Sequence, residues 1–100
     1  MYGTIGHFRV KAGMGEQLLD VLRQVGDLNL PGSVAAYCYR ADTSVQDYYI
    51  AVVFTSNEAY FAHAEHPEVA ALDNRLMELL ESEPEWHDGE IVYAMTEESR

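Results

Sequence analysis

Four histidines are the side chains in this sequence best suited to move a proton near neutral pH. Two of them, His63 and His66, are three residues apart, which on one continuous helix would place them on a shared face, where they could bind a metal ion. Pro67 interrupts such a helix, and no third ligand follows at a recognisable spacing. The sequence therefore predicts no metal site, and it predicts that His66 helps to cap a helix beginning at Pro67.

Aromatic side chains are the second group of candidates, since seven tyrosines, three phenylalanines and one tryptophan could supply flat walls for an aromatic ligand. Tyr48 and Phe54 would share one face of a strand that ends beside the following helix. Tyr60 lies one helical turn before His63, where it either packs beneath the helix or donates a hydrogen bond to a ligand oxygen. Asn57 could bond a substrate carbonyl, although a place at a helix start is a sufficient structural role.

Other catalytic motifs are absent from the sequence. It holds no phosphate-binding loop, no glycine-rich dinucleotide motif and no arrangement typical of a nucleophile triad. The single cysteine, Cys38, cannot form an internal disulfide, and its place in a strand-like run beside tyrosines favours a small buried hydrophobic residue over a reactive thiol.

Charge is distributed unevenly along the chain. Residues 58–100 carry twelve acidic and two basic side chains, which account for most of the net charge of −11. Such a negative field repels phosphate groups, so neither nucleic acid nor a membrane surface is an expected partner. No apolar run is long enough to span a bilayer, and the N-terminus lacks the basic region and apolar block of a signal peptide, which predicts a cytoplasmic protein.

Hydrophobic periodicity predicts the elements that must position these side chains. Strands are expected at 2–10, 33–40, 48–55 and 90–95, and helices at 16–28 and 57–82, the second broken at Pro67. Thr55, Ser56 and Asn57 can each cap the second helix, and Glu58 would complete a capping box with Thr55. Residues 83–89 are expected to be irregular or to turn, and the chain to end in a frayed segment, 96–100.

The element order βαββαβ predicts one ferredoxin-like α+β domain over residues 1–100, with both helices on one face of a four-stranded antiparallel sheet. Strand alternation makes both faces of this sheet apolar. One face would carry Ile5, Tyr48, Ile50, Val52 and Phe54, and the other Tyr49, Ala51 and Val53. Because water is a poor solvent for an apolar face, we expect a second copy of the chain to cover it in a homodimer.

Three segments resemble the antibiotic biosynthesis monooxygenase family, which belongs to the dimeric α+β barrels. FRVKAG at 8–13 is similar to the family's first strand, which ends in a basic residue, proline and glycine. PGSVAAYCYR at 31–40 is similar to its helix exit and second strand. FTSNEAYFAHAEHPEVAAL at 54–72 is similar to the signature in which an aromatic residue ends a strand and a serine-capped helix follows, with a histidine and then a proline.

The resemblance implies a barrel built from two subunits, with a cavity between each subunit's sheet and helices. Some members oxidise phenolic polyketides, quinols or related aromatics with molecular oxygen and no metal or flavin, and others degrade haem. Phe54, Val52 and Ala12 stand where the family usually has tryptophan, often has glutamate, and usually has proline. Haem-degrading relatives use an asparagine near Gly6-His7 and a histidine within the segment that here spans 69–74, and neither is present.

The function that the resemblance implies is a cofactor-independent monooxygenase acting on a small activated aromatic, and therefore an oxidoreductase. His7 would be the base, with His63 and Tyr60 orienting the substrate. The pocket would be formed by Ile5, Tyr48, Ile50, Phe54 and Asn57. The alternative is a non-catalytic barrel that binds a small apolar ligand or serves as an interaction module.

Overall fold

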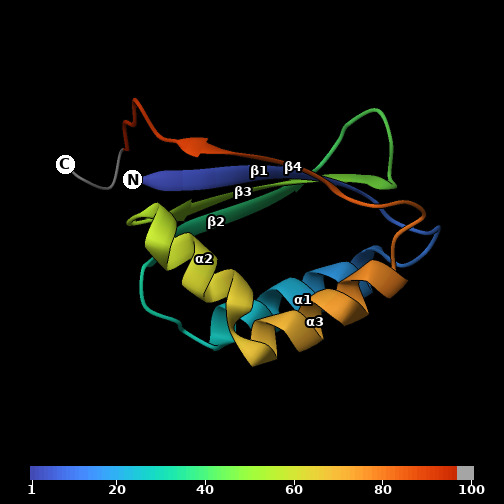
Figure 1. The fold of residues 1–100 in the computed structure, drawn as a ribbon. Coiled ribbons are helices and arrows are strands. Elements are labelled where there is room, and N and C mark those ends of the chain that lie inside the picture. Colours follow the sequence, from blue (N-terminus) through green and yellow to red (C-terminus); the bar gives the residue numbers. More distant parts are fainter. Residues whose placement is uncertain (97–100) are drawn as a thin grey trace.

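Four antiparallel strands and three helices form the fold of residues 1–96, the part of the chain that the computed structural model describes. In chain order the elements are β1 (Tyr2–Arg9), α1 (Gly15–Asp27), β2 (Ser33–Arg40), β3 (Asp47–Phe54), α2 (Asn57–Glu65), α3 (Pro67–Glu78) and β4 (Glu85–Glu90). The strands form one sheet in the order β2-β3-β1-β4, and all three helices lie on one side of it (Figure 1). This arrangement confirms the predicted ferredoxin-like α+β fold.

β1 lies inside the sheet and pairs with β3 on one side and β4 on the other. Its residues alternate between two environments, because successive side chains of a strand point to opposite faces. Thr4, Gly6 and Phe8 are buried beneath the helices, whereas Ile5 and Arg9 are exposed. The side that carries Phe8 is called the helix-facing side below, and the side that carries Ile5 is called the open face.

The hydrophobic core fills the layer between the helix-facing side of the sheet and helices α1 and α3. Apolar residues recur at helical spacing in both helices, so each presents one apolar face to the sheet. The buried residues of the core are Phe8, Val10, Leu18, Val21, Tyr48, Ile50, Leu76 and Leu80. Cys38 packs against this cluster, and burial raises the pKa of its thiol, which suits a structural residue.

The break between α2 and α3 is capped by side chains on both sides. Ser56 is the N-cap of α2, and its hydroxyl accepts a hydrogen bond from the backbone N–H of Ala59 at 3.1 Å. His66 ends α2 and caps α3, where its Nδ1 accepts a hydrogen bond from the backbone N–H of Glu68 at 3.2 Å. The predicted role of His66 is confirmed, and among the three candidate caps of α2 the structure selects Ser56.

Replacing Ser56 by alanine is expected to lower the free energy of unfolding by about 1 kcal/mol, because the N–H of Ala59 loses its acceptor at a helix start. Thr55→Ala is the matched control, since the cap of α2 is Ser56 and the Thr55 side chain is exposed. Denaturant unfolding of both variants measures the difference. An equal loss in the two would show that Thr55 shares the capping role.

The last strand lies earlier than the sequence pattern predicts. β4 consists of the six exposed residues EWHDGE at 85–90, so the prediction of a strand at 90–95 was wrong. These polar residues form a strand because β1 supplies the partner, with Trp86 opposite Gly6 and Asp88 opposite Thr4. Residues 91–96 lie outside the sheet. Of the frayed end expected at 96–100, only Thr96 lies within the described residues.

Candidate functional site

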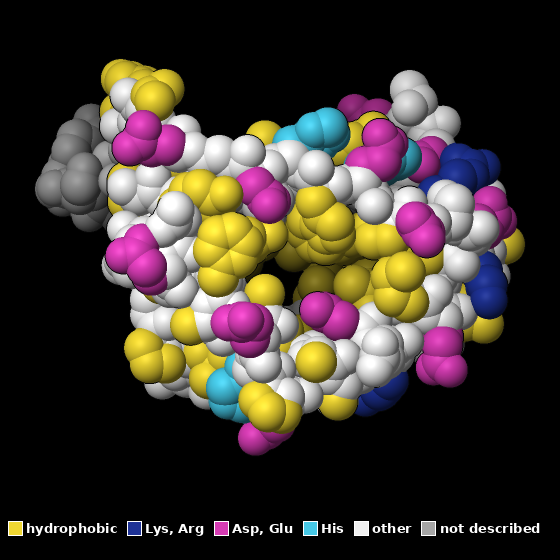
Figure 2. All heavy atoms as spheres, in the orientation of Figure 1, with side chains coloured by type: hydrophobic (Ala, Val, Ile, Leu, Met, Phe, Trp, Pro, Cys, Tyr) yellow, Lys and Arg dark blue, Asp and Glu magenta, His cyan; other side chains and the backbone are white. Residues whose placement is uncertain are grey.

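A hollow opens between the helix-facing side of the sheet and the helices, with hydrophobic side chains on its walls and acidic side chains at its rim (Figure 2). On this side of the sheet β1 carries the short residues Thr4 and Gly6 beside Phe8. Val52, which pairs with Thr4 from β3, stays only partly buried although its strand is central. The Trp86 ring covers Gly6, and Thr4 is 5% exposed, so neither residue opens directly to solvent.

Trp86 of β4 lies against Gly6 on the same side of the sheet. A Cβ atom on Gly6 would come within 2.6 Å of the Trp86 ring, so only glycine lets the indole lie this close to β1. The indole meets the Phe8 ring edge-on, with 5.3 Å between centroids, and 45% of the residue stays exposed. An indole that is nearly half exposed on the helix-facing side can form a wall for an aromatic ligand.

Tyr60 reaches from α2 to β4 and forms a hydrogen-bonded group with two residues of the sheet. Its hydroxyl donates to Oδ1 of Asp88 at 3.1 Å, and the hydroxyl of Thr4 donates to the same oxygen at 2.6 Å. Burial, followed by the neighbouring Asp88 carboxylate, raises the pKa of Tyr60 to about 12. Tyr60 therefore keeps its proton at neutral pH, and it links α2 to the strand that carries Trp86.

His63 lies one turn after Tyr60 on α2 and faces the sheet. Its ring meets Phe54 at 5.1 Å between centroids, and Phe54 also contacts the ring of Tyr60. Burial, and secondarily the nearby His66, lower the pKa of His63 below its ordinary value, so its imidazole is neutral at pH 7. Within residues 1–96 no hydrogen bond to the His63 ring is observed, which leaves its nitrogens able to accept a proton from a ligand.

The predicted pocket residues of β3 lie on the helix-facing side but are covered by protein. Tyr48, Ile50 and Phe54 are each less than a tenth exposed, and Tyr48 and Ile50 belong to the core. Asn57 is the first residue of α2 and is exposed, directly after the Ser56 cap. These three strand residues are buried in the packed layer, whereas Trp86 on the same side of the sheet is 45% exposed.

His7 and Ile5 lie on the open face, on the other side of the sheet from the hollow. Nε2 of His7 donates to Oδ1 of Asp47 at 2.8 Å, and its ring stacks on Tyr49 at 4.7 Å. Hydrogen bonds from Ser44 and from His7 lower the pKa of Asp47. The sheet separates His7 and Ile5 from Tyr60 and His63, so a single chain does not assemble the site that the sequence predicts.

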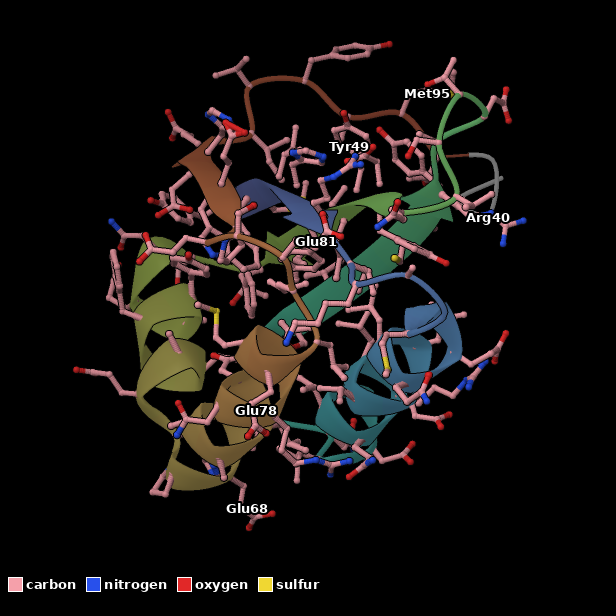
Figure 3. The ribbon with its side chains drawn as sticks, turned by 90° about the vertical axis from the view of Figure 1, so that its right-hand side faces the viewer. Arg40, Tyr49, Glu68, Glu78, Glu81 and Met95 are labelled. Carbon is pink, nitrogen blue, oxygen red and sulfur yellow. The ribbon has the colours of Figure 1, made fainter. Side chains whose placement is uncertain are left out.

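The open face carries a row of stacked aromatic rings. Tyr49 stacks on Tyr39 of β2 as well as on His7, and Figure 3 shows Tyr49 on the side of the sheet away from the helices. A groove of about 330 Å³ crosses the same face and is lined by residues of β1, β3, β4 and Ile91. Ile5, Tyr37 and Tyr39 are each more than half exposed, which leaves a large apolar surface uncovered in one chain.

Sequence reasoning missed four residues that β1 and β4 bring together on the helix-facing side: Thr4, Gly6, Trp86 and Asp88. The available signal was weak, since a glycine within a strand indicates close approach by another group but does not name that group. Trp86 and Asp88 fall in a polar segment without strand periodicity, so their partners on β1 follow only from the pairing register.

Within residues 1–96, no three histidine, cysteine, aspartate or glutamate side chains are grouped so that they could hold a metal ion. His63 and His66 are separated by the end of α2, and Nδ1 of His66 is used in capping α3. Among the described helices, none is long and apolar enough to cross a membrane.

Solved structures with the same fold include three that cover most of both chains. SnoaB from Streptomyces nogalater, a cofactor-independent oxygenase in a variant with asparagine replaced by alanine, matches with a TM-score of 0.83, 16% identity and coverage of 96% of this chain and 97% of that one. A protein from Mycobacterium tuberculosis matches with a TM-score of 0.81, 13% identity and coverage of 95% and 98%. A conserved protein from Methanosarcina mazei Go1 matches with a TM-score of 0.80, 12% identity and coverage of 88% and 89%.

At such identities the structural likeness shows the fold. No curated protein sequence matches the chain. The family model described as "Antibiotic biosynthesis monooxygenase" matches residues 1–75, three quarters of the sequence, and these residues run from β1 into α3 and include Tyr60 and His63. The chain therefore belongs to the antibiotic biosynthesis monooxygenase family.

Proposed function

We propose that this chain is a cofactor-independent monooxygenase that oxidises a small activated aromatic, such as a phenol, a quinol or a polyketide-like compound, in the hollow. The proposal rests mainly on His63. This histidine is half-buried and neutral, and its ring has no hydrogen bond within residues 1–96. It lies on α2, the helix that borders the hollow. Family membership supports the oxygenase class. SnoaB, which shares the fold, is itself described as a cofactor-independent oxygenase.

The chemistry requires a proton acceptor and a dry pocket. An aromatic substrate that loses a proton becomes an electron-rich anion, which can pass electrons to molecular oxygen, and exclusion of water protects that anion. When a CH₂ group of the substrate becomes a carbonyl, one atom of O₂ enters the product, and the other leaves as water with the two hydrogens that were removed. The substrate itself supplies all the electrons that reduce O₂, so the reaction needs no external reductant.

The accessible side chains at the hollow suit three separate tasks. In our proposal His63 accepts the proton, the Tyr60 hydroxyl orients the substrate, and Trp86 stacks on the aromatic ring. His7, which the family resemblance suggested as the base, is not assigned this role because it lies on the open face.

A homodimer is the second part of the proposal, with the open face as its interface. The exposed aromatic row and the apolar groove give this face the composition of a surface that a partner covers. In this arrangement His7, Ile5 and Tyr39 belong to the contact between subunits. Sedimentation of the purified protein is expected to give twice the mass of one chain, and a monomer at micromolar concentration would contradict this part alone.

The experiment that tests the function is oxygen uptake by metal-free protein, measured with a panel of quinols, anthrones and polyphenols. Uptake that forms the oxidised product in equal amount, and that persists in the presence of a chelator, supports the proposal. If folded protein consumes no oxygen with any member of the panel yet still binds aromatic compounds, the alternative of a non-catalytic binding barrel takes its place.

A further inference from the structure

We propose that Asp88 fixes the direction of the Tyr60 hydrogen bond, so that the Tyr60 oxygen accepts a hydrogen bond from the ligand and selects aromatics that carry a free hydroxyl group. This inference rests on the proposed function, because it assumes that the substrate occupies the hollow. It adds a positioning residue, Asp88, and a rule for the part of the substrate that meets Tyr60.

The inference rests on one hydrogen-bond acceptor that two hydroxyl groups share. Oδ1 of Asp88 receives the hydroxyl protons of both Thr4, at 2.6 Å, and Tyr60, at 3.1 Å. Thr4 is 5% exposed, so the group is anchored in the sheet through Thr4, while Asp88 lies on the exposed edge strand β4. Asp88 comes from β4, where the register with β1 places it opposite Thr4.

A tyrosine hydroxyl has one proton to donate and two lone pairs with which to accept. In Tyr60 that proton is directed at a carboxylate, and a hydrogen bond to an ionised acceptor is stronger than one to a neutral carbonyl. A ligand carbonyl would have to displace Asp88 to receive the proton. A ligand hydroxyl can instead donate to the Tyr60 oxygen, which the Thr4 hydroxyl also approaches, without displacing Asp88. The raised pKa of Tyr60 keeps its oxygen neutral in this role.

The Tyr60 oxygen lies close to the proposed wall of the hollow. Asp88 and Trp86 are two residues apart on β4 and therefore point to the same side of the sheet, about 7 Å from each other along the strand. A ring stacked on Trp86 would thus have its edge near Tyr60. The two contacts together favour a flat ligand with a hydroxyl at its rim, as in a phenol or a quinol.

Trp86 is the single tryptophan of the chain, so its fluorescence reports binding at this site without a label. The probes are 4-nitrophenol and 4-nitroanisole, which differ in the phenolic proton and a methyl group, and which both quench indole emission. Titrations are run at a pH below the pKa of the phenol, so that both probes are neutral. Wild-type protein is expected to bind the phenol roughly five- to tenfold more tightly than the ether, the value of one hydrogen bond.

Two variants test whether Tyr60 and Asp88 cause the preference for the phenol over the ether. Tyr60→Phe removes the acceptor, and Asp88→Ala removes the carboxylate and so frees the tyrosine proton to point toward the ligand. Both are expected to reduce the ratio of the two affinities to about one, in protein whose circular dichroism is unchanged. Asp42→Ala, at an exposed carboxylate in the loop between β2 and β3, is the matched control and should keep the wild-type ratio.

Equal affinity of wild-type protein for the phenol and the ether would overturn the inference alone and leave the proposed site in place. A wild-type preference that survives in folded Asp88→Ala protein would likewise remove Asp88 from its role. Failure of both probes to quench Trp86 would overturn the site and this inference together. Because binding is measured without turnover, these outcomes are distinct from a lack of oxygen uptake.

Discussion

Replacement of His63 by glutamine is expected to lower kcat/KM for oxygen uptake by about a hundredfold to ten-thousandfold, the range that a positioned general base contributes. Glutamine keeps the size and polarity of the side chain but cannot take up a proton at neutral pH. Because His63 contacts the ring of Phe54 and makes no hydrogen bond from its ring within residues 1–96, the fold should survive the change. Steady-state oxygen consumption at several substrate concentrations separates kcat from KM.

Glu16→Gln is the control, since Glu16 is an exposed residue in the first turn of α1, outside both the open face and the residues assigned to the reaction. It should leave kcat/KM within about twofold of the wild type, as expected of a surface change. Comparable losses in the two variants would remove His63 from the mechanism.

The acid limb of the pH profile gives an independent check on His63. A base must be neutral to accept a proton, so kcat/KM falls as the pH drops through its pKa. Burial lowers the pKa of His63 from its ordinary value, so the fall is expected on the acidic side of the pH at which an exposed histidine titrates. A fall centred above that pH would identify a different group as the base.

Phe8→Ala is expected to lower the free energy of unfolding by about 3–5 kcal/mol, because it leaves a large cavity at the centre of the core. Phe8 is fully buried and packs beside Trp86, Leu18 and Ile50 in the layer between β1 and the helices. For a domain of this size such a loss corresponds to a decrease in Tm of about 12 °C or more. Calorimetry or thermal circular dichroism measures it directly.

Phe61→Ala is the control for Phe8→Ala, since it makes the same chemical change at a residue that is half exposed on α2. The ring of Phe61 meets the rings of Tyr2 and Tyr60, and half of the residue is exposed, so its loss should be well below that of Phe8. If both variants lose the same stability, the core does not centre on Phe8 as the burial indicates.

Local sequence patterns predicted most of the elements within one or two residues. The helical spacing of Leu18, Val21 and Leu22 gave α1, and the valine- and tyrosine-rich runs gave β2 and β3. Pro67 predicted the division of α2 from α3, since proline favours the first turn of a new helix. Each of these signals depends on residues that are close together in the sequence, so it can be recognised without knowledge of the tertiary structure.

β4 could not be predicted in the same way, because its sequence shows no alternation of polar and apolar residues. Its residues become a strand through hydrogen bonds to β1, about eighty positions away in the chain, while the more apolar segment that follows stays outside the sheet. The assignment of faces failed for a related reason. Alternation shows that Ile5 and Phe8 lie on opposite sides, but when both sides are apolar it does not show which side of β1 matches Tyr48 on β3.

The same distinction between local sequence signals and long-range pairing applies to the candidate site. The sequence by itself determined the family, the two-part helix with Tyr60 and His63 one turn apart, and a chain with no recognisable nucleophile or phosphate motif. Only the tertiary structure separated His7 from these two residues and joined Tyr60 to Thr4 and Asp88. The physical reason is that spacing along a helix is set by bonds within a few residues, whereas pairing register decides which distant side chains meet above the sheet.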